Sequence, residues 1–92
     1  MSGIDKHGNE IDFGDRVYWS IGPSSAGYAF VAGETSYSER GSHVLLVEED
    51  KIGMPIHAGH CQRASRGHLD QVRPLRDRYL RRFPKALKEI TA

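Results

Sequence analysis

Residues 16–21 of the chain read RVYWSI, and this stretch sets the class of fold because its side chains alternate in polarity. In an extended backbone Val17, Trp19 and Ile21 would lie on one face, with more polar neighbours on the other. This period of two predicts a half-buried β-strand in which Trp19 packs inside. Residues 28–35 (YAFVAGET) alternate in the same way and predict a second strand.

An uninterrupted apolar run occupies residues 43–47 (HVLLV). Such a run predicts a strand that is covered on both faces, and we expect it at the centre of the sheet. Residues 54–62 should return as a fourth strand, and residues 68–72 should supply a short closing turn and strand after the polar stretch 63–67. Four to five short strands separated by turn-rich loops predict a mainly β fold, and a small barrel rather than a sandwich.

The spacing of apolar residues changes after Pro74. Six apolar side chains recur at about three- or four-residue intervals, which predicts an amphipathic helix over residues 75–92. They are Leu75, Tyr79, Leu80, Phe83, Leu87 and Ile90. Pro84 lacks the amide that would bond the carbonyl of Leu80, so we expect a kink near this residue.

The N-terminal residues carry a short motif. Residues 5–11 (DKHGNEI) contain a Gly-Asn turn that predicts a hairpin or arm over residues 1–11, and residues 14–17 read GDRV. Together they resemble the D-x-x-G-x-E-[IL]…G-D-x-V opening of small SH3-like barrel proteins from phages and other mobile elements. Such motifs recur across unrelated SH3-like families, including Tudor-like and KOW-like modules. Residues 68–75 (HLDQVRPL) are similar to the turn and strand that close such barrels. The resemblance implies an SH3-like barrel over about residues 12–74, and it implies fold more than function.

Length and cysteine content restrict the class of protein further. The 92 residues suit one small domain, and a single cysteine, Cys61, excludes an intramolecular disulfide. A lone cysteine favours a reducing compartment, so we expect a cytoplasmic location. No apolar run approaches the roughly 20 residues that a membrane span needs, and no secretory signal is visible, so we expect no membrane association. The small size leaves a homo-oligomer open.

Charge is unevenly divided along the chain. Residues 1–50 carry nine acidic and three basic side chains, whereas residues 51–92 carry ten basic and three acidic ones. This asymmetry predicts an acidic partner for the basic end, either nucleic acid or an acidic protein surface. The candidate contacts are Arg63, Arg66, Arg73, Arg76, Arg78, Arg81, Arg82, Lys85 and Lys88.

These patterns predict a non-enzymatic binding module, of phage or mobile-element type, that contacts nucleic acid through its basic C-terminal segment. Tyr18 and Tyr37 are the candidate exposed aromatic contacts. One alternative is a protein-interaction module that inhibits or recruits a host protein through the helix or an exposed strand. Another is an oligomer that sequesters an anionic nucleotide between subunits.

Chemistry-bearing residues give weaker signals. His57, His60, Cys61 and His68 could supply zinc ligands, but neighbours in a strand point to opposite faces, so whether they bind zinc stays open. A Cys-His nucleophile pair would lack an acidic group to orient it. We therefore expect no catalytic residues, no metal and no cofactor.

Overall fold

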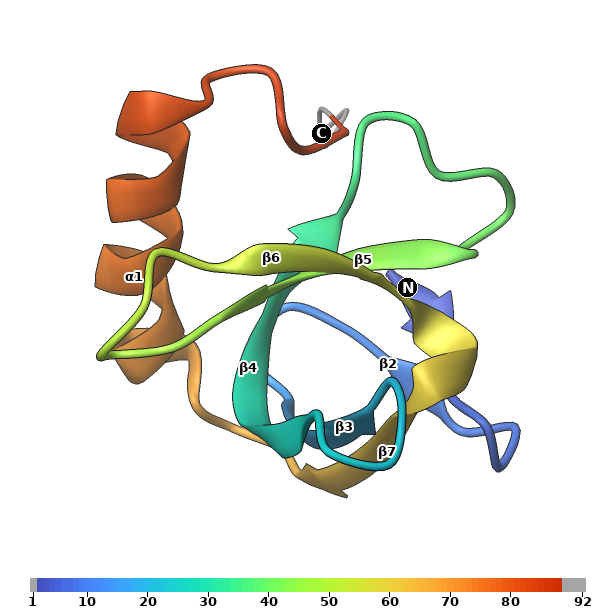
Figure 1. Cartoon of the computed structure of the whole chain (residues 1–92). Helices are drawn as coiled ribbons and strands as arrows, with labels where there is room; N and C mark the ends of the chain where they lie inside the picture. Colours follow the sequence, from blue (N-terminus) through green and yellow to red (C-terminus); the bar gives the residue numbers. More distant parts are fainter. Residues whose placement is uncertain (1, 89–92) are drawn as a thin grey trace.

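A five-stranded antiparallel sheet, strongly curved in Figure 1, forms most of the protein. The computed structural model describes residues 2–88. In spatial order the strands are β6 (Met54–His57), β5 (His43–Val47), β4 (Ala26–Glu34), β3 (Arg16–Ser20) and β7 (Cys61–Ser65). A two-stranded sheet of β1 (Gly3–Ile4) and β2 (Glu10–Ile11) precedes them, and one helix, α1 (Leu69–Arg82), follows. The mainly β prediction is thereby confirmed.

The topology places two consecutive strands, β6 and β7, at opposite edges of the sheet. Strands β3 to β6 form a meander, and the 3₁₀ turn η1 (Ala58–His60) then carries the chain to the opposite edge, where β7 pairs with β3. Residues 2–88 form no closed barrel, because β6 and β7 are the two edge strands of the sheet and do not pair with each other.

Five sequence predictions for the sheet were wrong. The fourth strand expected over residues 54–62 is two strands on opposite edges, separated by η1, and β4 rather than β5 is central. The stretch 63–65, expected to be a connection, belongs to β7, and residues 69–72 are helical where a strand was expected. Ile21 is 49% exposed because β3 ends at Ser20, so it does not join the buried face.

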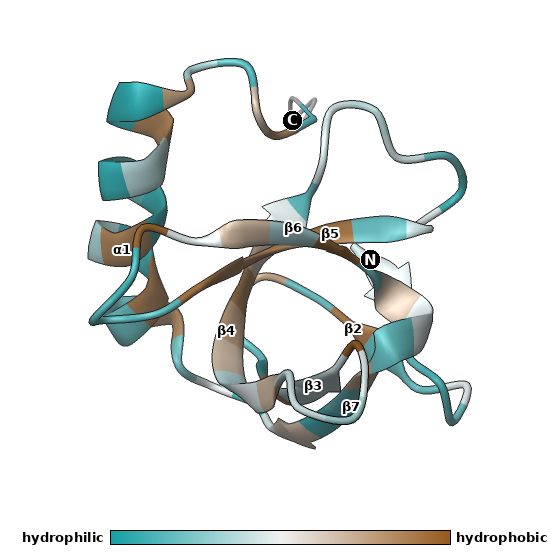
Figure 2. Ribbon diagram, in the orientation of Figure 1, coloured by the Kyte–Doolittle hydropathy of each residue, from teal (hydrophilic) through white to brown (hydrophobic). Residues whose placement is uncertain are grey.

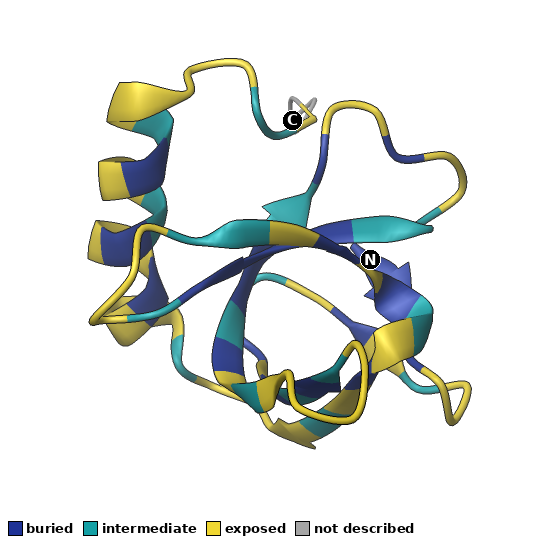
Figure 3. Ribbon diagram, viewed as in Figure 1, coloured by how far each residue is buried: buried dark blue, intermediate teal, exposed yellow. Residues whose placement is uncertain are grey.

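The core lies on both sides of β5, which accounts for its uninterrupted apolar run. Val44 and Leu46 pack in a cluster with Val17 and Trp19, inside the curve of the sheet. Leu45 and Val47 point the other way and contact the helix. The prediction of a strand covered on both faces is confirmed, and Figure 3 shows β5 buried along most of its length.

Helix α1 docks on the sheet by a narrow apolar stripe. Val72, Leu75 and Tyr79 are buried against Ala32 and Leu45, while the opposite side of the helix is polar and exposed (Figures 2 and 3). No helix within residues 2–88 is long and apolar enough to cross a bilayer.

The boundaries of the helix differ from the predicted 75–92. It begins at Leu69, with Pro74 inside it, and it ends at Arg82 instead of continuing through a kink. Pro84 disfavours a helical backbone at the preceding Phe83, which has φ −131° and ψ 76°. The chain then returns to the sheet, where the amide of Ser36 donates to the carbonyl of Ala86 at 2.8 Å. The last four predicted helical residues, 89–92, lie outside the described range.

Asp5 fixes the N-terminal hairpin to the edge of the sheet. Its side chain is 4% exposed and accepts hydrogen bonds from the amides of His7 at 2.9 Å and Asn9 at 2.8 Å. Its second oxygen accepts from the amide of Arg63 in β7, at 2.9 Å. Gly8, with φ +80°, permits the tight turn between these donors. The first residue of the D-x-x-G motif is therefore a structural acceptor that caps the free edge of β7.

Candidate functional site

The nine basic residues singled out in the sequence do not form one surface. Arg63 and Arg66 lie beside the N-terminal hairpin, where both guanidinium groups donate to the carbonyl of Glu10, at 3.0 and 3.1 Å. Arg66 also lies 3.9 Å from the carboxylate of Asp15, a loose ion pair, and burial still raises the pKa of the Asp15 carboxyl above its ordinary value. These two cations hold the hairpin against the sheet.

Three more of the nine are occupied within the fold. Arg78 donates to the carbonyls of Glu48 at 2.7 Å, Glu49 at 3.2 Å and Lys51, so it pins the turn between β5 and β6. Lys88 lies 3.3 Å from a carboxylate oxygen of Glu34. The guanidinium of Arg76 is half-buried, 5.2 Å from the ring centroid of Phe13.

The other four cations are exposed and have no hydrogen bond or ion pair within the described chain. They are Arg73, Arg81, Arg82 and Lys85. Asp77, one helical turn from both Arg73 and Arg81, lowers the net charge along the middle of α1.

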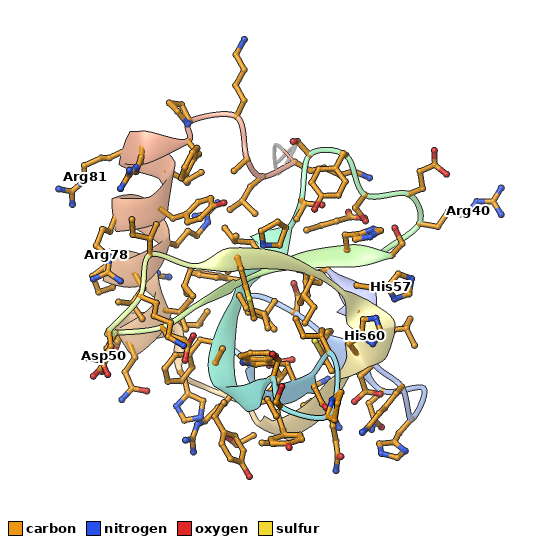
Figure 4. The ribbon with its side chains drawn as sticks, in the orientation of Figure 1. Arg40, Asp50, His57, His60, Arg78 and Arg81 are labelled. Atoms are coloured by element: carbon orange, nitrogen blue, oxygen red, sulfur yellow. The ribbon has the colours of Figure 1, made fainter. Side chains whose placement is uncertain are left out.

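Three of these four cations lie where α1 ends, and we call Arg81, Arg82, Phe83 and Lys85 the cationic end. Phe83 is 45% exposed, and the guanidinium of Arg82 lies 5.9 Å from its ring centroid. Residues 82–86 line an open hollow of about 410 Å³. In Figure 4 Arg81 points away from the sheet, on the side of the molecule opposite Arg40.

A second surface lies on the outer side of the sheet, and we call Arg16, Tyr18, Tyr28 and Gln62 the tyrosine face. Tyr18 and Tyr28 are direct cross-strand partners on β3 and β4, with ring centroids 5.3 Å apart and ring planes inclined by 64°. Tyr28 is 52% exposed, and the guanidinium of Arg16 lies 4.6 Å from its ring centroid. A recess of about 210 Å³ is lined by Tyr18, Tyr28, Gln62, Arg63 and Ala64.

The two tyrosines named by the sequence analysis are separated in the fold. Tyr37 is 59% exposed but belongs to the loop between β4 and β5, where its ring contacts His43 at 5.3 Å between centroids. The partner of Tyr18 is Tyr28, which the sequence analysis did not select as a candidate contact. Tyr18 and Tyr28 are neighbours because of the register between β3 and β4. The loop between these strands sets this register, and no local sequence motif predicts it.

A larger hollow, of about 470 Å³, opens on the other side of the Arg16–Tyr28 pair. Its lining includes Phe30, His68 and the acidic residues 48–50. His68 is held by the hydroxyl of Ser65, at 2.7 Å, and its ring lies 5.4 Å from that of Phe30. The acidic turn therefore places carboxylates beside one end of the tyrosine face.

The histidine and cysteine set does not converge. His57 and His60 have ring centroids 5.8 Å apart, but Cys61 is fully buried in the core and His68 lies at the start of α1. Within residues 2–88 no group of three or more His, Cys, Asp or Glu side chains is arranged to hold a metal ion. Burial, with a smaller contribution from the Asp5 charge, raises the pKa of the Cys61 thiol to about 11, which disfavours the thiolate.

The fold thus offers two exposed surfaces: the cationic end, where three exposed cations flank an exposed aromatic residue, and the tyrosine face, where aromatic rings border a recess. Of the sequence-predicted contacts, Arg81, Arg82 and Lys85 belong to the first surface and Tyr18 to the second. Phe83, Arg16, Tyr28 and Gln62 were not predicted as contacts. No protein-family model, curated protein or solved structure matches this chain.

Proposed function

We propose that this protein is a non-enzymatic binding module that contacts nucleic acid through the cationic end. The observation that carries the proposal is that Arg81, Arg82 and Lys85 lie exposed within five residues of the chain, with no hydrogen bond or ion pair to residues 2–88. The exposed ring of Phe83 lies among them in the sequence, 5.9 Å from the guanidinium of Arg82. A cation that is already bonded to a carboxylate or a carbonyl contributes less free energy to phosphate binding than a free cation does. A guanidinium also fits the geometry of a phosphate group and stays charged at every physiological pH.

The proposal makes a quantitative claim about salt. Each neutralised phosphate releases condensed counterions, so the logarithm of affinity falls with the logarithm of salt concentration by about 0.9 per contact on duplex and 0.7 on single strands. With three free cations at the cationic end, we expect a slope of about −2 to −3. The contacts are to the backbone, so discrimination between sequences by this surface should be small.

A fluorescence-anisotropy titration of labelled oligonucleotides at increasing salt concentration tests this function. Changing Arg81, Arg82 and Lys85 together to Gln should abolish most of the salt dependence. The matched control changes Lys6, Arg40 and Lys51 to Gln, which removes the same charge from exposed cations outside the cationic end. Absence of binding by the unaltered protein at low salt refutes the proposal, as does equal weakening by both triple variants.

An acidic protein segment is a second candidate for the same surface. It is favoured by the hollow of about 410 Å³ beside Phe83, because an apolar anchor residue could fill it while carboxylates meet the cations. Phe83→Ala separates the candidates. This substitution should lower the affinity for an acidic amphipathic peptide at least tenfold and leave the affinity for duplex DNA nearly unchanged. The nucleotide-sequestering oligomer stays a prediction, and sedimentation at micromolar concentration tests it.

We also propose that the sheet is an open variant of the SH3-like barrel. Support comes from the four-strand meander, the 3₁₀ turn η1 and the return of β7 to β3. A crystal structure in which β3 and β7 were not neighbours would refute this assignment.

A further inference from the structure

We infer that the tyrosine face binds an unpaired nucleobase, in the recess that Tyr18 and Tyr28 line together with β7. The inference rests on the proposed function, and it narrows the ligand to single-stranded nucleic acid.

The shape of the recess is the first argument. The two rings are in edge contact and inclined by 64°, so they form a corner in which a flat ring system stacked on one tyrosine meets the other tyrosine with its own edge. Offset-stacked and edge-to-face contacts are the geometries that aromatic groups prefer. The volume, about 210 Å³, lies below the roughly 300–1,000 Å³ of pockets for drug-sized ligands, so it suits one ring system.

Charge complementarity decides between possible occupants. Paired aromatic side chains also bind quaternary ammonium groups, but the guanidinium of Arg16 already covers Tyr28 at 4.6 Å, and Arg63 lines the other side of the recess. These two cations repel a cationic ligand and attract the phosphates that flank a base. Arg63 uses one of its five N–H donors on the carbonyl of Glu10, and the rest can meet a phosphate oxygen.

Polar groups at the recess match the edge of a base. Gln62 is exposed on β7 directly across from Tyr18, and its side-chain amide both donates and accepts hydrogen bonds. The acidic residues 48–50 border the other side of the Arg16–Tyr28 pair and repel phosphates. The backbone of a bound strand is therefore directed toward Arg63. A base that stacks on a tyrosine in this recess has to leave its duplex, so paired nucleic acid is excluded from this surface.

Substitution of Tyr28 tests the inference in the full chain. Tyr28→Leu should lower the affinity for a single-stranded octanucleotide roughly five- to hundredfold, which is the effect of losing one base–aromatic stack. The slope of log affinity against log salt concentration should not change. Tyr28→Phe keeps the ring and should bind normally. Tyr37→Leu, which removes an equally exposed tyrosine elsewhere, is the matched control. Circular dichroism verifies that each variant is folded, and unchanged affinity of a folded Tyr28→Leu variant overturns the inference.

An uncharged probe separates this inference from the proposed function. Adenosine and guanosine carry no phosphate, so in an NMR titration they should shift the signals of Tyr18, Tyr28 and Gln62 even if the cationic end binds nothing. Loss of oligonucleotide binding with these shifts retained refutes only the proposed function. Salt-dependent oligonucleotide binding without these shifts, or with equal affinity for duplex and single strand, refutes the tyrosine recess.

Discussion

Removal of the Asp5 carboxylate should destabilise the whole protein. Asp5→Ala leaves the amides of His7, Asn9 and Arg63 without their acceptor. A hydrogen bond to a charged group contributes about 1.5–3 kcal/mol, and because one carboxylate serves all three donors we expect a total loss of about 2–4 kcal/mol. For a domain of this size the melting temperature then falls by roughly 8–30 °C.

Thermal and urea unfolding, followed by circular dichroism, measure this loss. Asp5→Asn should be intermediate, because its carbonyl oxygen can still accept from His7 and Asn9 while its NH₂ group faces the amide of Arg63. Glu10→Ala removes an exposed carboxylate from the same hairpin and should change stability by less than about 0.5 kcal/mol. If Asp5→Ala proved as stable as Glu10→Ala, the hairpin would not be held by this acceptor.

The Asp5 carboxylate also makes the stability of the fold depend on pH. Burial alone would raise its pKa, but the amide donors of Arg63, Asn9 and His7 outweigh burial and hold the pKa below the ordinary value of 3.8. A carboxyl whose pKa is lower in the folded state stabilises fully above its unfolded pKa, and this contribution is lost as pH falls through the folded pKa. Asp5→Asn cannot titrate here, so between about pH 5 and pH 2 it should lose less stability than the unaltered protein. Parallel pH profiles would contradict this assignment.

Three further predictions concern the core. Gly53→Ala should cost about 1–3 kcal/mol in urea unfolding, because Gly53 has φ +136° and an added Cβ would lie 2.8 Å from the carbonyl oxygen of Leu46; a neutral result contradicts this close approach. Leu45→Ala should cost about 2–5 kcal/mol, since Leu45 is 1% exposed between sheet and helix; a loss below 1 kcal/mol would mean that α1 packs loosely. The buried Cys61 thiol should react with a chromogenic disulfide reagent only after denaturation, and rapid native reaction would show that it is accessible.

Local patterns predicted the strands well where one short segment carried the whole signal. Alternation located β3 and β4, and the apolar run located β5, to within about two residues. The division of residues 54–62 by η1 was missed, because pairing of β7 with β3 is a contact between segments far apart in the sequence. The start of α1 was missed as well. His68 precedes the helix without a side-chain capping bond, and Pro74 suggested a boundary where the helix continues.

The candidate site was less predictable than the fold. The sequence shows where the basic residues are but not which of them lack a hydrogen-bond partner in the fold. Arg63, Arg66 and Arg78 bond to carbonyls 53, 56 and about 30 residues away in the chain. The tyrosine face depends on strand register, which brings Tyr28 rather than Tyr37 to Tyr18. Surfaces built from side chains on three strands leave no contiguous motif in the chain.

The bond from Arg63 to Asp5 joins residues 58 positions apart, and this separation affects how the protein is made. The hairpin leaves the ribosome before its partner strand, because Arg63 is synthesised 58 residues after Asp5. Until then its carboxylate remains hydrated and the edge it will cover does not exist. We expect this corner to be the last to acquire protection in pulsed hydrogen exchange during refolding, because contacts between distant segments close slowly.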